Sequence, residues 1–544
     1  MNRAIRFDNQ DIQKEIAGYD ITQSHAVHFA RTYRNVSRTE NGALGYRTTG
    51  HELLDLNFRV SSLRGREERY IADSFVKAFY EDRRHAVKWL FYLRDIAEGL
   101  GERRSFRVCL KYLAQSHPEI AGELMELIPL YGRYDDLLVL LDSPLEEKVC
   151  AYIGRMLERD LCAMAEGRPV SLLAKWLPGN DTSSKATRAL AGRLSRGLGM
   201  GSRAYRKNLS ALRAYADVLE VKISASEWDR VDYAKVPAKA NLKYDAAFAR
   251  HDEARRSDWL RSVYMGDDKI NCKGLMPYEI VRKMLPGTGW CSAVRSNLLA
   301  ELMWQKLLQD GFQNEWGLED CIVVADGSGS MYSPVSGTAG VRAIDVCHSL
   351  AIYFASKLQG VFRDKAISFS RRPQMIDLGQ GGNLREKLEI MRAHDEVDNT
   401  DIEAVFDLLL DMAVSRQVPA EQIPGQVLII SDMEFDEAAE DHVWENGRPQ
   451  KTGETLFEFI AAKFSAAGYP VPRLIFWNVC GRSDTIPAVQ GEQGVCLLSG
   501  FSQNAIRTAA HREIKDPYES LLRTLDGSRY APVEEALSRA GVGA

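Results

Sequence analysis

Apolar residues recur at spacings of three and four through most of the first 300 residues, as in helices that pack one face against a core. Short turns such as Gly99-Leu100-Gly101 interrupt this pattern. No alternation typical of strands competes with it. The segments with helical periodicity are 73–99, 102–116, 119–128, 133–141, 145–165 and, before the second half, 298–310. Helix pairs joined by short turns are typical of an α-solenoid, in which stacked units form a curved binding surface.

The second half has a different pattern, in which short apolar runs alternate with helical periodicity. Continuous apolar runs suit strands that are buried on both faces of a sheet. We expect strands at 321–325, 366–370, 427–430, 473–479 and 494–498, and helices at 343–358, 384–391, 402–412, 455–467, 518–525 and 533–540. Crossovers of helical length predict a doubly wound α/β domain with a mostly parallel sheet. The chain therefore divides into an all-α helical-repeat domain, 1–317, and an α/β domain, 318–544.

The first strand of the second domain ends in an Asp-x-Ser-x-Ser loop. Asp326, Ser328 and Ser330 present three side-chain oxygens on alternate residues, and the intervening glycines permit a tight bend. Divalent hard cations bind oxygen ligands, and ligands bind such sheets at the carboxyl ends of their strands. One carboxylate and two hydroxyls under-neutralise such an ion, which would keep room for an outside acidic ligand. The loop predicts a divalent-metal site.

Two later segments can complete that site. Thr400 precedes the amphipathic run 402–412, and Asp432 ends the apolar run that begins at Val427. With the first loop, these residues resemble the von Willebrand factor A (vWA) family, whose metal-ion-dependent adhesion site (MIDAS) draws on three loops. The resemblance implies that Ser328, Ser330 and Thr400 bind the metal directly or nearly so, and that Asp326 and Asp432 act partly through water. Mg²⁺ is the expected ion, with Mn²⁺ or Ca²⁺ as alternatives. The opposing interpretation is a degenerate domain that keeps the fold and holds no metal.

Charge is divided unevenly along the chain. Residues 1–300 contain 48 lysines and arginines against 39 acidic residues, a net charge of +9, whereas residues 301–544 have a net charge of −14. The excess is concentrated in one stretch, opposed only by Asp181: Lys175, Lys185, Arg188, Arg193, Arg196, Arg203, Arg206 and Lys207. A cluster of this kind indicates a polyanionic partner, and we expect RNA. The alternatives are a solvated helix face or a docking surface for the acidic domain.

Several phrases of the helical half resemble an uncharacterised Ro-like family of bacterial, plant, fungal and viral proteins. They are Leu93-Arg94-Asp95-Ile96, 99–104, 129–138, Lys175-Trp176-Leu177-Pro178, Tyr205-Arg206-Lys207 and Val236-Pro237. The family is similar in layout to the Ro autoantigen, in which a ring of HEAT-like helices, the TROVE domain, is closed by a vWA domain. The resemblance implies a HEAT-like, ring-shaped helical domain and an RNA-binding ribonucleoprotein function. It covers most of residues 40–535.

Composition limits the class of protein. The N-terminus shows no signal-peptide pattern, and no run of 18 apolar residues occurs, so we expect a cytoplasmic protein without a membrane partner. The nine cysteines form no Cys-x-x-Cys pair, which argues against structural zinc and disulfides.

Enzymatic interpretations find little support in the sequence. His51-Glu52-Leu53-Leu54-Asp55 lacks the second histidine of a metalloprotease helix and is interpreted as a helix start. Asp135-Asp136 is interpreted as a solvated pair, because adjacent carboxylates diverge on a helix. His348 is interpreted as a packed histidine. Hydrolysis at the metal is the least favoured hypothesis, since no base or nucleophile is identifiable beside it, and we expect no catalytic residues.

Two functional hypotheses remain. The first is an RNA-binding scaffold that holds structured or single-stranded RNA on the basic helical surface, without DNA specificity. The second is a protein-interaction adaptor, in which the metal binds an acidic residue of a partner protein. The first predicts binding that weakens steeply with salt, and the second predicts binding that depends on the metal.

Overall fold

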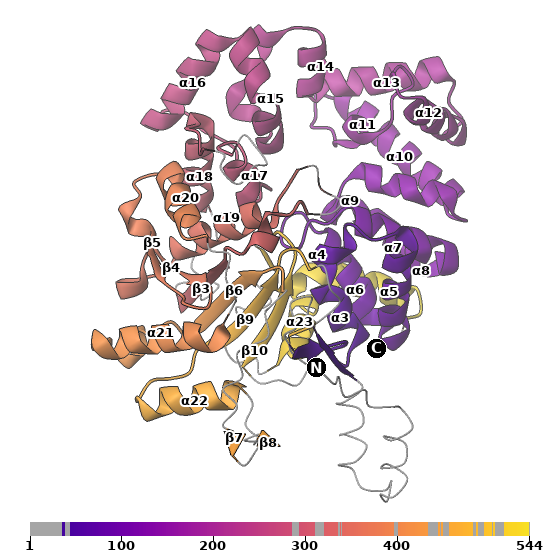
Figure 1. Cartoon of the computed structure of the whole chain (residues 1–544). Coiled ribbons are helices and arrows are strands. Elements are labelled where there is room, and N and C mark those ends of the chain that lie inside the picture. Colours follow the sequence, from indigo (N-terminus) through magenta and orange to yellow (C-terminus); the bar gives the residue numbers. More distant parts are fainter. Residues whose placement is uncertain are drawn as a thin grey trace, which may run out of the picture.

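A helical N-terminal region is followed by a C-terminal α/β region built on a six-stranded mixed sheet (Figure 1). The computed structural model describes residues 35–38, 44–285, 293–310, 320–335, 338, 340–395, 401–433, 444–445, 448–449, 456–481, 486–487, 494–502, 504–505 and 516–542. The predicted domain boundary at 317/318 lies outside these residues. No helix within them is both long enough and apolar enough to cross a membrane.

The first half is helical, as its periodicity predicted. Its α-helices are α3 (Glu52–Phe58), α4 (Val60–Leu63), α5 (Glu68–Glu81), α6 (Arg83–Arg94), α7 (Arg104–Ser116), α8 (Pro118–Leu124), α9 (Ile128–Tyr131), α10 (Glu146–Ala165), α11 (Leu173–Trp176), α12 (Lys185–Gly197), α13 (Ser202–Tyr215), α14 (Leu219–Ser224), α15 (Ala238–His251), α16 (Glu253–Met265), α17 (Pro277–Val281) and α18 (Leu298–Asp310). The 3₁₀ helices η1 (Met125–Leu127), η2 (Tyr134–Asp142), η3 (Trp228–Arg230) and η4 (Tyr233–Lys235) join some of them.

Three expectations for this half are corrected. The segment 73–99 does not form one helix, because Asp82 adopts an extended backbone between α5 and α6 and caps α6. The segment 133–141 is the 3₁₀ helix η2 rather than an α-helix. Strands are present, since β1 (Val36–Arg38) pairs antiparallel with β2 (Leu44–Tyr46). Three-residue strands are too short to show alternation.

The helices follow an arch whose two ends both rest on the α/β region (Figure 1). At one end, α3 packs against strand β10 (Val495–Ser499), and α6 packs against helix α23 (Pro517–Leu525). At the other end, α17 packs against helix α19 (Ala343–Ala355). The middle helices, α10 to α16, lie away from the sheet. The α/β region therefore spans the two ends of the arch.

The order of the main sheet is β10-β9-β6-β3-β4-β5. Its remaining strands are β3 (Cys321–Asp326), β4 (Lys365–Phe369), β5 (Met375–Asp377), β6 (Gln426–Ser431) and β9 (Arg473–Asn478). All neighbours are parallel except the edge pair β4 and β5, which confirms a mostly parallel sheet. The predicted strands are found with small shifts at their ends, and β5 was missed. From β3 the chain adds β4 on one side and later β6 on the other, so the topological switch point lies between β3 and β6.

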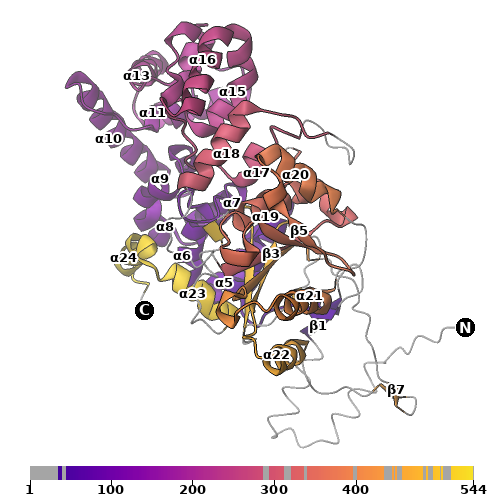
Figure 2. The ribbon, with the colours of Figure 1, turned by 90° about the vertical axis from the view of Figure 1, so that its left-hand side faces the viewer.

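Helices cover both faces of this sheet. Helix α19 lies on one face, and α21 (Ile402–Ser415) with α22 (Leu456–Ala466) lies on the other (Figure 2). All 13 residues of α19 are buried, because β3 packs on one side of it and α17 packs on another. Helix α20 (Leu384–Ala393) packs beside it, and α24 (Ala531–Arg539) packs on α6 and α8. A separate two-stranded ribbon joins β7 (Trp444–Glu445) and β8 (Arg448–Pro449).

Candidate metal centre and basic surface

The carboxyl ends of β3 and β6 bring two of the predicted ligands to one edge of the sheet. Ala325 of β3 is in register with Ile430 of β6, so Asp326 and Ser431 leave the sheet side by side. Asp432 follows directly. This edge is the switch point, where open parallel sheets bind ligands. The buried apolar residues of both strands anchor the edge from below.

The Asp326 carboxylate is buried and held by two donors. The Ser431 hydroxyl donates to Oδ2 at 2.6 Å, and the Ser328 backbone N–H donates to Oδ1 at 2.9 Å. A carboxylate whose two oxygens both accept hydrogen bonds is fixed in orientation. Ser431 was not recognised as part of the site from the sequence, although it precedes Asp432.

The two serine hydroxyls of the loop lie together. Ser328 Oγ and Ser330 Oγ are 3.0 Å apart, and both residues are half-buried. Adjacent ligands of an octahedral Mg²⁺ ion, bound at about 2.1 Å, are about 3.0 Å apart. The 3₁₀ helix η6 (Gly329–Tyr332) places Ser330 at this position. The two hydroxyls form a hydrogen bond at this distance, and the same spacing would let them bind adjacent positions of a small divalent cation.

The chemistry of the donor set decides which ion fits. Within the described residues, no group of three or more His, Cys, Asp or Glu side chains is arranged to hold a metal. The predicted ligands at this edge combine hydroxyl and carboxylate oxygens, a set that suits Mg²⁺ better than a transition metal. Thr400, the fifth predicted ligand, lies outside the described residues. The four described candidates, Asp326, Ser328, Ser330 and Asp432, fit a hard cation.

Cys347 of α19 is buried near this edge, and the pKa of its thiol is affected by the carboxylates around it. Burial raises the pKa of its thiol well above the ordinary value, and the carboxylates of Asp326, Asp395 and Asp432 raise it further. The charges of three carboxylates thus act on one buried thiol. A thiol with so high a pKa stays protonated and is a poor nucleophile.

The structure divides the predicted RNA-contact residues into two groups. Lys175 is paired with Glu220 at 3.3 Å, and Arg193 donates to Asp142 and Glu146 at 2.6 and 2.7 Å. These ion pairs raise the pKa of Arg193. The other six side chains are exposed, and none forms an ion pair with a carboxylate of the described residues: Lys185, Arg188, Arg196, Arg203, Arg206 and Lys207. We call these six residues of α12 and α13 the cationic face.

A cavity of about 660 Å³ lies between the helical arch and the loop that follows the Asp-x-Ser-x-Ser motif. Thr338 contributes from that loop, and the cationic side chains come from the helical side: Arg64, Arg103, Arg104, Arg107 and Lys111. Three of these arginines are already engaged, with Glu102, Asp135 and Asp136. Most of the positive charge of the cavity is thus compensated.

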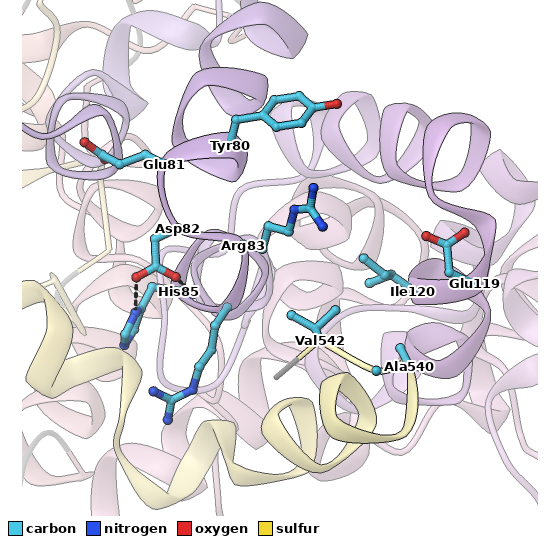
Figure 3. Close-up of a pocket in the computed structure, with 11 residues that line it drawn as sticks. Tyr80, Glu81, Asp82, Arg83, His85, Glu119, Ile120, Ala540 and Val542 are labelled. Atoms are coloured by element: carbon cyan, nitrogen blue, oxygen red, sulfur yellow. Dashed lines mark hydrogen bonds and ion pairs between the residues drawn. The ribbon is translucent and has the colours of Figure 1, made fainter. Parts of the chain in front are cut away.

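A second cavity, of about 570 Å³, lies where the C-terminal tail meets α5, α6 and α8 (Figure 3). His85 Nδ1 lies 2.6 Å from the Asp82 carboxylate there, and Ala540 and Val542 line the opposite wall. This cavity is remote from the sheet edge that carries Asp326. Asp82 pairs with His85 inside it, and Arg84 pairs with Asp526 and Glu534 beyond its wall. The cavity belongs to the junction between the two regions.

Comparison with known proteins gives relatives without an assigned activity. Residues 39–134 and 195–313 match the model of a domain of unknown function, DUF2828. Residues 320–529 match a second domain of unknown function, DUF7788. An uncharacterised protein of Acanthamoeba polyphaga mimivirus is 27% identical over 538 residues, which cover 92% of this chain and 89% of the viral protein.

The two family matches correspond to the two structural regions of the chain. The match to DUF2828 lies within the helical arch, and the match to DUF7788 begins just before β3. Both regions are shared in one order with a viral protein of similar length. The two families and the viral protein have names that describe no activity.

Proposed function

We propose that this protein is a Ro-like RNA-binding scaffold, in which the cationic face holds RNA phosphates and the edge of a vWA-like sheet holds a divalent cation. The observation that carries the proposal is the cationic face. Six exposed cations on two consecutive helices, with no ion pairs to described carboxylates, are available for phosphates. Surface cations that are locked in ion pairs, such as Arg193, would bind phosphate less readily.

Two features of the α/β region support the vWA-like part of the proposal. The five parallel strands with one antiparallel edge strand follow the doubly wound order, with Asp326 and Asp432 at the switch point. The serine hydroxyls have the separation expected of neighbouring metal ligands. A bound cation would supply Lewis-acid attraction for an oxygen ligand. The chain's own residues would hold that cation and orient the loop.

The test is RNA binding by purified protein at several salt concentrations, measured by fluorescence anisotropy. The variant reverses four charges of the cationic face: Arg196→Glu, Arg203→Glu, Arg206→Glu and Lys207→Glu. For single-stranded RNA, each lost phosphate contact lowers the slope of log K against log salt by about 0.7, so we expect the slope to fall by about 3. Binding at low salt should weaken by orders of magnitude.

A matched control reverses four exposed cations at the other side of the arch: Lys243→Glu, Arg250→Glu, Lys269→Glu and Lys273→Glu. Both variants change the net charge equally, so only a local contact separates them. Equal weakening in the two variants would reject the cationic face as the RNA site. If the parent protein binds no RNA at low salt, the scaffold proposal fails.

The second candidate, a protein-interaction adaptor, is favoured by one observation. Of the two described carboxylates at the metal edge, that of Asp326 already accepts hydrogen bonds from two donors, so a bound cation there would retain attraction for an outside acidic ligand. The adaptor predicts capture of an acidic protein partner that EDTA abolishes and that charge reversal on α12 and α13 leaves unchanged. The same two variants, with and without EDTA, therefore separate the hypotheses.

A further inference from the structure

Three side chains next to the metal edge form a cluster that the proposed ligands do not include, in which His348 is buried and Tyr332 is half-buried. Tyr332 ends η6, His348 lies in the middle of α19, and Asp395 follows α20. They are distant in sequence, and the packing of α19 against α20 brings them together. The cluster adjoins the loop that carries Ser328 and Ser330, because Tyr332 is the last residue of η6, the short helix that contains Ser330.

The Asp395 carboxylate bridges the other two residues. Tyr332 Oη donates to Oδ2 at 2.5 Å, and His348 Nε2 donates to Oδ1 at 2.9 Å. The side chains of His348 and Asp395 are 3% and 4% exposed, so water competes little with either bond. One carboxylate oxygen of Asp395 thus accepts from η6 and the other from α19, so Asp395 links the loop to α19.

The tyrosine ring is held from a second direction. The Arg342 guanidinium lies 5.4 Å from the centroid of the Tyr332 ring, and the same guanidinium pairs with Asp345 at the start of α19. Burial and the hydrogen bond to Asp395 raise the pKa of the Tyr332 phenol, so it remains a donor at neutral pH. The phenol is therefore held by its hydrogen bond to Asp395 and by a contact with the Arg392 side chain.

The position of Ser330 depends on such contacts. A four-residue 3₁₀ helix has little stability of its own, because short helices make few hydrogen bonds for the residues that they order. The side chains of Met331, which is buried in the core, and Tyr332 anchor η6 directly after Ser330. A metal site binds tightly when its ligands are already oriented, and outer contacts supply that orientation.

We propose that Asp395 is a positioning residue of the metal centre, which holds Tyr332, and through it the loop with Ser328 and Ser330, in the geometry that binds a divalent cation. This inference rests on the proposed function, since it requires a metal at this edge. Asp395 and Tyr332 do not contact the ion. They act on its affinity by fixing the loop.

The experiment measures the Mn²⁺ dissociation constant of the full chain by titration calorimetry, well below the unfolding temperature. Tyr332→Phe removes one hydroxyl and no charge. Outer-shell changes of this kind weaken metal binding by about 10- to 100-fold, so we expect the Kd of Y332F to rise at least about tenfold. D395N should weaken binding as well, because a donor amide nitrogen replaces one of the two oxygens that accept from Tyr332 and His348. S330A removes a ligand and should bind weakest.

A matched control removes the same kind of bond elsewhere. Tyr233 Oη donates to the Asp252 carboxylate at 2.8 Å, within the α15 and α16 region. Tyr233→Phe should lower stability as Y332F does and leave the Mn²⁺ affinity of the folded protein unchanged. A role of Tyr332 in stability alone would make the two variants alike in metal affinity.

The outcomes distinguish the two proposals. If the parent binds Mn²⁺ and S330A does not, but Y332F and D395N bind like the parent, the metal site stands and the positioning role is rejected. If the parent binds no divalent cation, or S330A binds like the parent, the proposed metal site fails and the inference fails with it. Weakening in Y332F without weakening in Y233F supports the inference.

Discussion

Asp136 is buried in the structure, although its place beside Asp135 in the sequence predicted an exposed carboxylate. It was interpreted as one of a solvated pair, but its side chain is fully buried. Arg94 of α6 donates to one carboxylate oxygen at 2.8 Å, and Arg107 of α7 donates to the other at 2.6 Å. Burial alone would raise the pKa of Asp136, but the two guanidinium groups outweigh it and hold the pKa below its ordinary value.

Replacement of Asp136 should be strongly destabilising. Asp136→Ala leaves the buried Arg94 guanidinium without its carboxylate, a loss of about 3–5 kcal/mol in the free energy of unfolding. The measurement is urea denaturation of the full chain at pH 7. Asp267→Ala, at an exposed position of the helical region, serves as the control and should change stability by less than about 0.5 kcal/mol. Equal midpoints for both variants would contradict the prediction.

At the scale of elements, the junction between α5 and α6 combines a helix cap with a contact to the C-terminal region. The Asp82 side chain accepts a hydrogen bond from the His85 backbone N–H at 3.0 Å, which caps α6. The His85 ring lies between the carboxylates of Asp82 and Asp526. The hydrogen bond with Asp82, above all, and the charge of Asp526 raise the pKa of His85. Lys88 and Arg84 also face Asp526.

The raised pKa of His85 predicts the sign of a pH effect. A histidine with a higher pKa in the folded state stabilises the fold fully below its unfolded pKa, near 6.5, and loses that effect as the pH rises through the folded value. The free energy of unfolding of the parent should therefore exceed that of His85→Gln by more at pH 5.5 than at pH 8.5. Denaturation curves at both values provide the measurement. A difference that grows with pH would refute the assignment.

At the scale of the whole molecule, the two regions share a buried polar interface rather than a simple linker. The Asp95 carboxylate of the arch has no exposed surface, and Arg529 donates to its two oxygens at 2.8 and 2.9 Å. This arrangement raises the pKa of Arg529. Ser61 donates to Asn478 at the end of β9, so strand ends also contact the arch. The arch and the sheet are therefore expected to unfold together.

Removal of the interface cation tests this coupling. Arg529→Ala leaves the Asp95 carboxylate buried without its ion pair, and we expect a loss of about 3–5 kcal/mol. A single calorimetric transition should move to lower temperature or split into two, because the arch and the sheet lose their shared anchor. Arg523→Ala, an exposed position on α23, should leave the transition unchanged. An unaltered transition in the Arg529 variant would show that the interface is not held by this pair.

The sequence by itself determined the elements and the chemistry of the candidate metal edge. Apolar periodicity follows from local backbone geometry, so the helical first half and the strands β3 and β6 could be predicted, and Asp326, Ser328, Ser330 and Asp432 could be named from the loops that follow. The break at Asp82 and the short strand β5 were missed, because a cap and an edge pairing override a weak local pattern.

Only the tertiary structure decided which side chains meet. The partners of Asp136, the pairing of Arg193 with Asp142, and the bridge from Asp395 to Tyr332 join residues that are 29 to 63 positions apart. The physical reason is that hydrogen bonds and ion pairs depend on distances of about 3 Å, which the packing of helices sets and residue spacing does not encode. The same packing left six of the eight predicted RNA-contact residues exposed and engaged the other two in ion pairs.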